Sequence, residues 1–282
     1  MVRIGLIQID GKLPNLALMK LAAWHKKQGD DVRIIDLSSL GVDRWYGSKI
    51  FMGGSGYDIK QKLPKEIEVQ IPDYDLYNVD YSMGFTTRGC IRDCDFCIVK
   101  EKEGEFHEQD FSKDIKHLKY IVMDNNFLAS PKWREKLKFF IDNNIKVNFN
   151  QGLDIRLIDE EKAEMLSKVK YYDGKFVERR LYFAFDDPAT EPIFREKIEI
   201  LLKYIKPLHI MVYMLVGFNT TFEQDMHRYK ILWKEYGVYP FVMIYNNKRS
   251  NPKLRKLARW INKRVHKVCE FEDYDRKKYE GR

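Results

Sequence analysis

Short apolar runs alternate with amphipathic segments along most of the chain. In residues 1–77, the runs RIGLIQI, DVRIIDL and SKIFMGGSG predict three strands. The segment NLALMKLAAWHKKQG predicts a helix with Leu16, Met19 and Ala23 on one stripe and Gly29 at its end. Strand–helix–strand alternation indicates a parallel sheet, so this stretch is interpreted as a small α/β unit.

The alternation becomes regular from residue 78 to residue 247. Six apolar runs predict six strands: YSMGFTT, YIVMD, KVNFNQ, RLYFAFDD, HIMVYMLVGF and PFVMIYN. Five intervening segments predict helices: 110–119, 131–144, 159–169, 191–205 and 221–237. Because the strands are nearly continuous apolar runs, we expect both of their faces to be covered. Six β/α units are too few for a closed eight-stranded barrel, so the pattern predicts an open, partial barrel.

Polar segments follow these strands directly. DNNF, NQGLDIR, FDD, VGFNTT and YNN each come after a predicted strand, and so does a loop with three cysteines. Ligands in such folds bind at the carboxyl ends of the strands. The sequence therefore predicts a site where these segments meet.

The last segment, residues 248–282, carries the excess positive charge. The chain has a formal net charge of +8, and this segment holds 13 basic and five acidic side chains, so the remainder is balanced. Apolar positions recur there at helical spacing opposite a basic face, which predicts an amphipathic basic helix. The basic face is either a solvated surface or a surface for nucleic acid, and Trp260, Tyr274 and Tyr279 would allow RNA bases to stack.

Composition places the chain among globular proteins with a sizeable core. It is 44% hydrophobic and 33% charged, and no apolar run approaches the roughly 20 residues of a membrane span. We therefore expect no membrane partner, and the N-terminal apolar run is interpreted as a buried strand rather than a signal peptide. Four cysteines, three of them crowded together, make a poor disulfide framework and favour a reducing, cytoplasmic location.

The three crowded cysteines are Cys90, Cys94 and Cys97, in GCIRDCDFC. Thiolates are soft ligands that suit iron–sulfur centres, and three of them leave one iron of a four-iron cluster without a protein ligand. A zinc site with Cys269 or His107 as a distant fourth ligand is the alternative.

This CxxxCxxC loop, with the aromatic Phe96 before its third cysteine, resembles the signature of the radical S-adenosylmethionine (SAM) enzymes. The resemblance implies a partial (β/α)6 TIM-like barrel, an oxygen-sensitive [4Fe-4S] cluster on the three cysteines, and SAM bound at the open iron. In that family an electron from the cluster splits SAM into methionine and a 5′-deoxyadenosyl radical, which abstracts hydrogen from the substrate. The resemblance also implies a reductant protein of the flavodoxin or ferredoxin type.

After the second strand, the family carries a short polar motif for the amino group of SAM. Asp124, Asn125 and Asn126 occupy that place here and offer acceptor oxygens to an ammonium group. The alternative is a helix cap before Pro131.

Single residues at later strand ends resemble binding residues of the family. Gln151, Asp154 and Arg156 follow the third strand, where the arginine would pair with the SAM carboxylate or form only a surface pair with Asp154. Asp186, after the fourth strand, would hold the ribose hydroxyls. Gly217, after the fifth, would lie near the adenine, although the usual Pro-Gly-Glu is absent.

Residues 1–77 resemble a degenerate cobalamin-binding, Rossmann-like domain. The unit is short, contains no DxHxxG to supply a cobalt ligand, and places His25 among lysines, where we expect it to be exposed. Cobalamin is therefore not expected.

The domain prediction is thus a small α/β unit (1–77), a radical SAM partial barrel (78–247) and a basic helix and tail (248–282). The predicted function is a radical SAM enzyme; the alternative is a non-catalytic iron–sulfur or zinc protein that binds nucleic acid through its tail. The chain has no second cysteine cluster, which argues against methylthiolation and leaves RNA, a peptide or a small molecule open as substrate. Arg88 and Arg92 flank the cysteines and are expected to ease cluster reduction.

Overall fold

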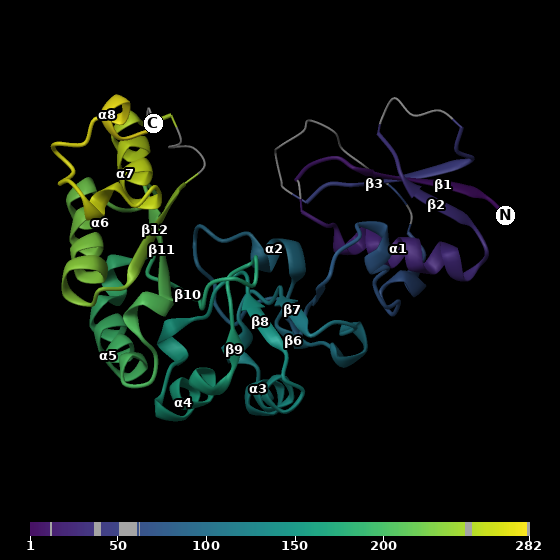
Figure 1. The fold of residues 1–282 in the computed structure, drawn as a ribbon, viewed down its shortest axis with the longest axis horizontal. Helices are drawn as coiled ribbons and strands as arrows, with labels where there is room; N and C mark the ends of the chain where they lie inside the picture. The colour runs from purple at the N-terminus through teal and green to yellow at the C-terminus, as the bar shows by residue number, and fades with distance from the viewer. Residues whose placement is uncertain (12, 37–40, 51–60, 62, 246–249, 281–282) are drawn as a thin grey trace. The chain divides into compact units, whose positions relative to one another are not determined.

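The computed structural model describes residues 1–11, 13–36, 41–50, 61, 63–245 and 250–280 (Figure 1). The chain divides into two compact units, residues 1–84 with 110–120 and residues 85–109 with 121–282. The borders predicted after residues 77 and 247 stay a prediction. No described helix is long and apolar enough to cross a membrane.

The first unit contains a three-stranded parallel sheet and one long helix. The sheet order is β2-β1-β3, with β1 at Arg3–Gln8, β2 at Asp31–Ile34 and β3 at Arg44–Ser48. Helix α1 spans Leu16–Lys27, and the Asn15 side chain caps it by accepting a hydrogen bond from the Leu18 N–H. The predicted strand 48–56 overlaps β3 only at Ser48, and most of it lies outside the described residues.

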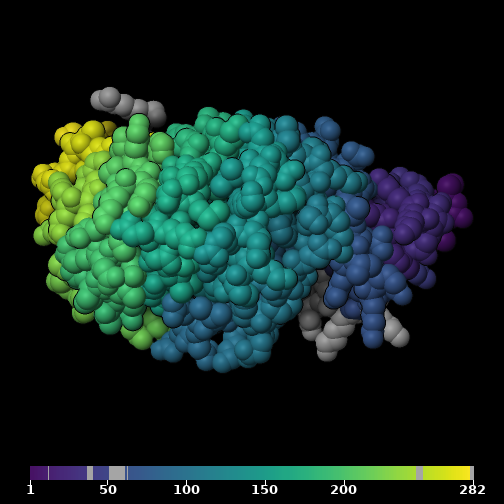
Figure 2. All heavy atoms as spheres, turned by 90° about the horizontal axis from the view of Figure 1, so that it is seen from below, coloured from purple at the N-terminus to yellow at the C-terminus, as the bar shows by residue number. Residues whose placement is uncertain are grey.

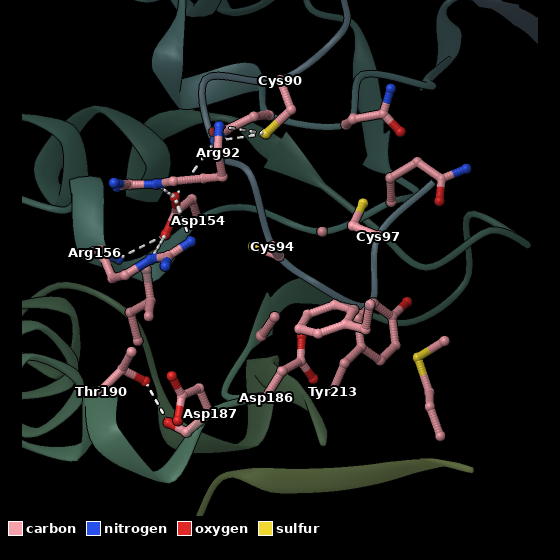
Figure 3. A pocket seen from close by; sticks show the side chains of 18 of the residues that line it. Cys90, Arg92, Cys94, Cys97, Asp154, Arg156, Asp186, Asp187, Thr190 and Tyr213 are labelled. Carbon is pink, nitrogen blue, oxygen red and sulfur yellow. Dashed lines mark hydrogen bonds and ion pairs between the residues drawn. The ribbon is translucent and has the colours of Figure 1, made fainter. Parts of the chain in front are cut away.

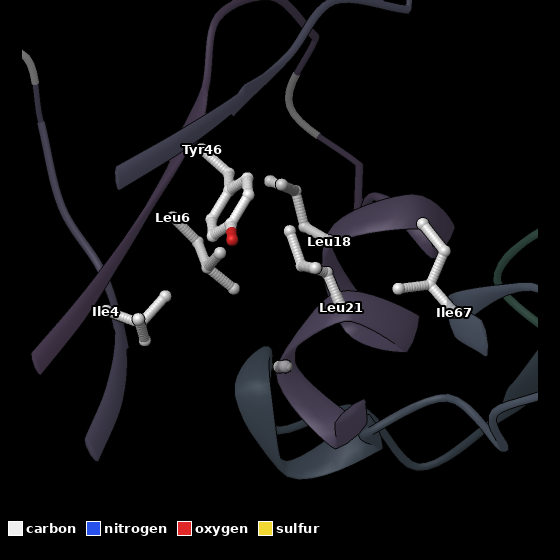
Figure 4. Packing of buried hydrophobic residues seen from close by; sticks show 7 residues of the cluster. Ile4, Leu6, Leu18, Leu21, Tyr46 and Ile67 are labelled. Atoms are coloured by element: carbon white, nitrogen blue, oxygen red, sulfur yellow. The ribbon is translucent and has the colours of Figure 1, made fainter. Parts of the chain in front are cut away.

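The core of the first unit lies between α1 and the sheet (Figure 4). It consists of Ile4, Leu6, Leu18, Leu21, Ala22, Tyr46 and Ile67. The prediction that His25 is exposed is wrong: the side chain is buried, and its Nδ1 lies 2.8 Å from a carboxylate oxygen of Asp30. The buried face of α1 is thus rotated from the predicted stripe and includes the histidine, whose aromatic ring packs against Tyr46.

The helix predicted for residues 110–119 is wrong. The structure has only a 3-10 turn there, Ser112–Asp114, before the chain continues to strand β7 (Lys119–Val122). The reason is a competing acceptor, because the hydroxyl of Ser82, in the short strand β4 (Ser82–Gly84), accepts hydrogen bonds from the N–H groups of Lys116 and His117. These two donors are satisfied without a helix.

The second unit is built mainly from parallel strands. Strands β10, β11 and β12 are neighbours in one parallel sheet, and β7, β8 and β9 are neighbours in another. An isolated parallel bridge between Leu153 and Phe183 connects the segment after β8 with β10. The strands are β5 (Thr87–Arg88), β6 (His107–Glu108), β7 (Lys119–Val122), β8 (Lys146–Phe149), β9 (Lys170–Tyr171), β10 (Leu181–Ala184), β11 (Ile210–Val216) and β12 (Tyr239–Ile244). The described strands form no closed barrel, and the partial (β/α)6 barrel stays a prediction.

The helices of this unit are α2 (Val99–Glu103), α3 (Trp133–Asp142), α4 (Glu160–Lys168), α5 (Glu191–Leu202), α6 (Phe222–Tyr229), α7 (Pro252–Asn262) and α8 (Arg276–Glu280). Five of them, α3 to α7, lie within predicted amphipathic segments; α2 and α8 were not predicted, and α7 ends at Asn262, before the end of the predicted stripe at Val268. Their starts agree with local chemistry, since Asp159 caps α4 and Thr221 forms a capping box with Gln224 at α6. Helix α6 is shorter than predicted, because the chain continues as a π-helical segment, Lys230–Glu235.

Helix α7 packs against strand β12 at the end of its sheet. The Asn262 side chain donates a hydrogen bond to the Val242 carbonyl (2.9 Å) and accepts one from the Val242 N–H (2.8 Å), as a neighbouring strand would. In the space-filling view the yellow C-terminal residues lie directly against the green residues that precede them (Figure 2). Trp260 and Tyr274 are buried, so the prediction that they are available for base stacking is wrong.

The two faces of β11 differ in exposure. Burial alternates strictly along Ile210–Val216, with Met211, Tyr213 and Leu215 only half-buried. The expectation that both faces of the strands are fully covered is therefore wrong for β11. The partly open face borders the cavity that holds the candidate site.

Candidate active site

The cysteine loop begins and ends on a two-stranded antiparallel ribbon. Strands β5 and β6 pair Thr87 with Glu108 and Arg88 with His107. Gly89 follows with φ +71°, and a Cβ there would stand 2.6 Å from the Glu105 carbonyl oxygen. Only glycine fits this crossing, so the residue before Cys90 is fixed by the geometry of the ribbon.

A buried aspartate supports the loop from behind. The Asp124 carboxylate accepts hydrogen bonds from the Thr86 N–H (2.6 Å), the Thr86 hydroxyl (2.5 Å) and the Thr87 hydroxyl (2.9 Å). The side chain is buried, and burial raises its pKa while the threonines lower it in part. Asp124 does not border the cavity, so the structure places this predicted SAM ligand as a support of the segment before the cysteines.

Two further ionic contacts hold the same segment. Glu103 accepts hydrogen bonds from the Gly89 N–H (3.1 Å) and the Asn125 amide (2.8 Å), and pairs with Arg88 at 3.2 Å. The buried Lys136 of α3 donates to the Thr86 carbonyl (3.0 Å) and pairs with Glu108 at 2.7 Å. Sequence reasoning missed Lys136, because a lysine in an amphipathic helix is normally solvated.

The three cysteines border a cavity of about 1090 Å³ in the second unit (Figure 3). The Cys97 N–H donates to the Cys94 carbonyl (2.8 Å), which closes a turn between two of the cysteines. The cavity also brings together most of the predicted binding residues, from successive strand ends: Phe96, Asn125, Asn126, Gln151, Asp154, Arg156 and Asp186. Asp124 and Gly217 are the two predicted binding residues that do not border it.

One wall of this cavity is polar. We call Asn125, Asn126, Gln151, Asp154 and Arg156 the polar wall. Asp154 lies at its centre and pairs with Arg156 through both carboxylate oxygens (2.7 and 3.0 Å) and with Arg92 at 2.9 Å. These partners keep the pKa of Asp154 below its usual value although burial opposes them. The guanidinium predicted to meet the SAM carboxylate is thus already held by a carboxylate of the chain.

The polar wall also touches the cysteines. The Cys90 sulfur accepts hydrogen bonds from the Arg92 N–H (3.4 Å) and the Asn126 amide (3.6 Å). Burial raises the pKa of the Cys94 thiol, and the nearby charge of Arg156 offsets part of that rise. The proposed help of Arg88 and Arg92 in reduction stays a prediction, and each of these charges is balanced by a carboxylate.

Asp186, which follows β10, also borders the cavity. Its carboxylate accepts a hydrogen bond from the Leu215 N–H (2.8 Å), and burial raises its pKa. Gly217 takes a φ of +78° after β11 and turns the chain so that Phe218 and Thr220 reach the cavity. The Phe96 ring meets Phe218 edge to face, with centroids 5.7 Å apart.

The opposite wall is apolar and was not predicted. It consists of alternate residues on strands β10, β11 and β12. We call these residues the aromatic wall: Tyr182, Met211, Tyr213, Phe241 and Met243. The Tyr182 and Tyr213 rings stack with centroids 5.6 Å apart. The Tyr213 ring lies over Gly152, where an added Cβ would be 3.4 Å from it. No sequence signal marks this wall, because IMVYMLV is apolar on both faces.

A buried arginine joins the strand ends behind the aromatic wall. Arg228 is fully buried and donates to the carbonyls of Phe185 (2.6 Å), Asp186 (2.9 Å) and Leu215 (2.7 Å). It also pairs with the buried Asp225 at 2.6 Å. Sequence reasoning missed this pair because both residues belong to the polar pattern of FEQDMHRY.

The donor set suits an iron–sulfur cluster. Three free thiols on one short loop border the cavity, and one accepts two N–H hydrogen bonds, as thiolate ligands of such clusters do. Cys269 and His107, the alternative fourth ligands of a zinc site, do not border the cavity. Within the part of the chain that the structure describes, neither these thiols nor any other group of three or more His, Cys, Asp or Glu side chains is gathered closely enough to hold a metal ion, so the fit rests on residue type and the shared cavity.

Comparison with known proteins gives one informative match. No family model matches the chain. It is 22% identical over 189 residues to the tRNA-2-methylthio-N(6)-dimethylallyladenosine synthase of Sulfurihydrogenibium sp. (strain YO3AOP1). The match covers 58% of this chain and 43% of that protein, so the chain spans less than half of its relative. The similarity to a tRNA methylthiotransferase supports the radical SAM superfamily and does not define a branch.

Proposed function

We propose that the chain is a radical SAM enzyme that cleaves SAM reductively and abstracts hydrogen from a substrate. The observation that carries the proposal is the single cavity bordered both by Cys90, Cys94 and Cys97 and by polar residues from successive strand ends. The distant similarity to a methylthiotransferase supports the same chemistry. A purely structural metal site would have no use for a cavity of this size and polarity.

The chain's own residues would divide the work within the cavity. Cys90, Cys94 and Cys97 would hold a [4Fe-4S] cluster, which supplies the electron that splits SAM into methionine and a 5′-deoxyadenosyl radical. Asn125, Asn126 and Gln151 would offer amide groups to the amino acid end of SAM.

The ribose and adenine would lie farther along the cavity. Asp186 has one carboxylate oxygen held by the Leu215 N–H, which leaves the other for the ribose hydroxyls. Phe96 and Phe218 would exclude water beside the adenine. We expect a cytoplasmic protein with an electron donor of the flavodoxin or ferredoxin type.

The test is formation of 5′-deoxyadenosine after anaerobic reconstitution with iron and sulfide, reduction and addition of SAM. The wild-type chain should form it, and Cys94→Ala should lower the rate at least about a hundredfold because a cluster ligand is lost. Cys269→Ala is the matched control and should behave as wild type. No 5′-deoxyadenosine from the wild type, or an undiminished rate in Cys94→Ala, would contradict the proposal.

We do not propose the relative's reaction for this chain. The relative's name describes a synthase of a methylthio-modified adenosine in tRNA. Only Cys269 remains in this chain outside the cysteine loop, so these residues alone cannot hold a second cluster as a sulfur source. The net reaction after hydrogen abstraction is left open.

A further inference from the structure

The aromatic wall sets the chemistry of the group it accepts. Its five side chains carry two phenols, one phenyl ring and two thioethers, and none of them is charged. Burial raises the pKa of Tyr182 and Tyr213, so both phenols stay neutral. Flat rings and polarisable sulfur favour a planar, uncharged aromatic group.

The cavity provides little for a phosphate. Among the described residues that border it, only Arg92 and Arg156 are cationic, and both pair with Asp154. The remaining charged residues on its lining are acidic: Asp93, Asp95, Asp186 and Asp187. An anionic substrate would therefore have to keep its negative charge outside the cavity.

Positive charge is concentrated on helix α7 instead. Between residues 250 and 268 the chain has seven Lys and Arg and no Asp or Glu. We define the α7 basic surface as Lys253, Arg255, Lys256, Arg259 and Lys263, which are exposed or half-buried. Within the residues that the structure describes, no ion pair joins any of the five to a carboxylate, and the structure records contacts only for the side chains of Lys253 and Lys256, among them those with Phe222, Phe271 and the Glu272 carbonyl.

The α7 basic surface starts near the rim of the cavity. The Lys253 Nζ lies 3.8 Å from the centroid of the Phe222 ring. Phe222 begins α6 two residues after Thr220, which borders the cavity. A strand of phosphates along α7 would thus lie close to a base inserted into the cavity.

We propose that the substrate is RNA, with one unpaired base against the aromatic wall and the neighbouring phosphates on the α7 basic surface. The inference rests on the proposed radical SAM function for its chemistry, but RNA binding can be measured without it. Uncharged aromatic surface inside and unpaired cations outside are the two requirements for holding a base that has left its stack. An acidic peptide would bind the cations of the α7 basic surface but would have no need of the aromatic wall.

The first arm measures binding of a fluorescein-labelled RNA hairpin with an unpaired loop to the reconstituted full chain over a range of salt concentrations. The variant Arg255→Glu/Arg259→Glu/Lys263→Glu should weaken binding at least about tenfold and reduce the slope of log K against log salt by about two to three. The matched control is Lys138→Glu/Lys168→Glu/Lys203→Glu, which changes the net charge equally on exposed residues of other helices.

The second arm tests the aromatic wall. Tyr213→Leu keeps an apolar side chain but removes the flat ring, and it should weaken binding about fivefold to a hundredfold. A hairpin with abasic loop nucleotides should bind the unchanged protein more weakly by a similar factor. The abasic probe keeps this arm decisive if Tyr213→Leu folds poorly, which its thermal unfolding curve would reveal.

Each outcome bears on the proposal. Equal binding by the two triple variants, a polyglutamate peptide that displaces the hairpin, or full affinity for the abasic hairpin would overturn it. Formation of 5′-deoxyadenosine without RNA binding would refute this inference alone. RNA binding without 5′-deoxyadenosine formation would refute the proposed function and leave an RNA-binding protein.

Discussion

The two walls of the cavity are built by different means. The polar wall contains charged and amide side chains whose positions are fixed by one another, with Asp154 between Arg92 and Arg156. The aromatic wall contains neutral side chains whose positions follow from the register of β10, β11 and β12. The position of a buried polar side chain is fixed by its hydrogen-bond and ionic partners. The position of an aromatic ring on a parallel sheet is fixed by its residue's place on the strand.

Buried ionic side chains support the backbone in both regions. Asp124 accepts hydrogen bonds from the Thr86 N–H and from the hydroxyls of Thr86 and Thr87 behind the cysteine loop. Arg228 donates to three carbonyls at the ends of β10 and β11. The two supports differ in kind, because Asp124 binds one backbone donor and two hydroxyls, whereas Arg228 satisfies three backbone acceptors.

Arg228→Met should have the largest effect on the aromatic side. It leaves Asp225 buried without its partner and three carbonyls without donors, so we expect the free energy of unfolding to fall by about 3–5 kcal/mol. Urea unfolding measures this. Lys138→Met, in an exposed pair with Asp142, is the control and should cost less than about 0.5 kcal/mol. Equal losses in the two variants would contradict the role of Arg228, and adding Asp225→Ala to Arg228→Met should recover part of the loss.

Asp124→Ala should have the next largest effect, on the polar side. Three donors of Thr86 and Thr87 lose their acceptor, so the free energy of unfolding should fall by about 3 kcal/mol. Iron uptake during reconstitution should fall as well, because the segment before Cys90 is no longer held. The control is Asp142→Ala, at an exposed position of α3. Normal iron uptake in Asp124→Ala would show that cluster assembly does not depend on the support that Asp124 gives to the segment before Cys90.

Asn262→Ala should cost less, about 1–2 kcal/mol in the free energy of unfolding, because the N–H and carbonyl of Val242 each lose one partner. Because β12 carries part of the aromatic wall, loss of these two hydrogen bonds should also increase the fluorescence quenching of the wall's tyrosines. Asn143→Ala removes one exposed helix-end hydrogen bond to Phe139 and is the matched control. Unfolding of both variants at the same urea concentration would contradict the proposed role of Asn262 in pairing with Val242 of β12.

The smallest expected effect is a pH dependence of opposite sign at two aspartates. The folded pKa of Asp154 is lowered by Arg156 and Arg92, so its contribution to stability is present at neutral pH and is lost as pH falls through that pKa. The folded pKa of Asp186 is raised by burial, so the wild type should gain stability relative to Asp186→Asn as pH falls from neutral. Urea unfolding of Asp154→Asn and Asp186→Asn between about pH 7 and pH 2 tests both signs, because the Asp154 contribution is lost only below the ordinary carboxyl pKa of about 4. If the free energy of unfolding depends on pH in the same way for both variants, the predicted difference between Asp154 and Asp186 is wrong.

Much of the second unit could be predicted from local pattern. Apolar runs and amphipathic segments place most strands and helices within a few residues, because each element carries its own periodicity and cap, as at Asp159 and Thr221. One failure, in the first unit, shows the limit of local pattern. Residues 110–119 have a polar pattern compatible with a helix, but Ser82, 34 and 35 residues before Lys116 and His117, takes two of the backbone donors that a helix would need.

The sequence alone predicts the chemistry offered at the strand ends. The spacing of Cys90, Cys94 and Cys97 carries its own signal, whereas Asn125, Asn126, Gln151, Asp154, Arg156 and Asp186 are predicted from their places after apolar runs and from the family resemblance. Which of these side chains are free for a ligand depends on the tertiary structure. It turned Asp124 inward and gave Arg156 a carboxylate partner, and it opened one face of β11 to make the aromatic wall. Burial and pairing depend on residues distant in sequence, and no local pattern encodes them.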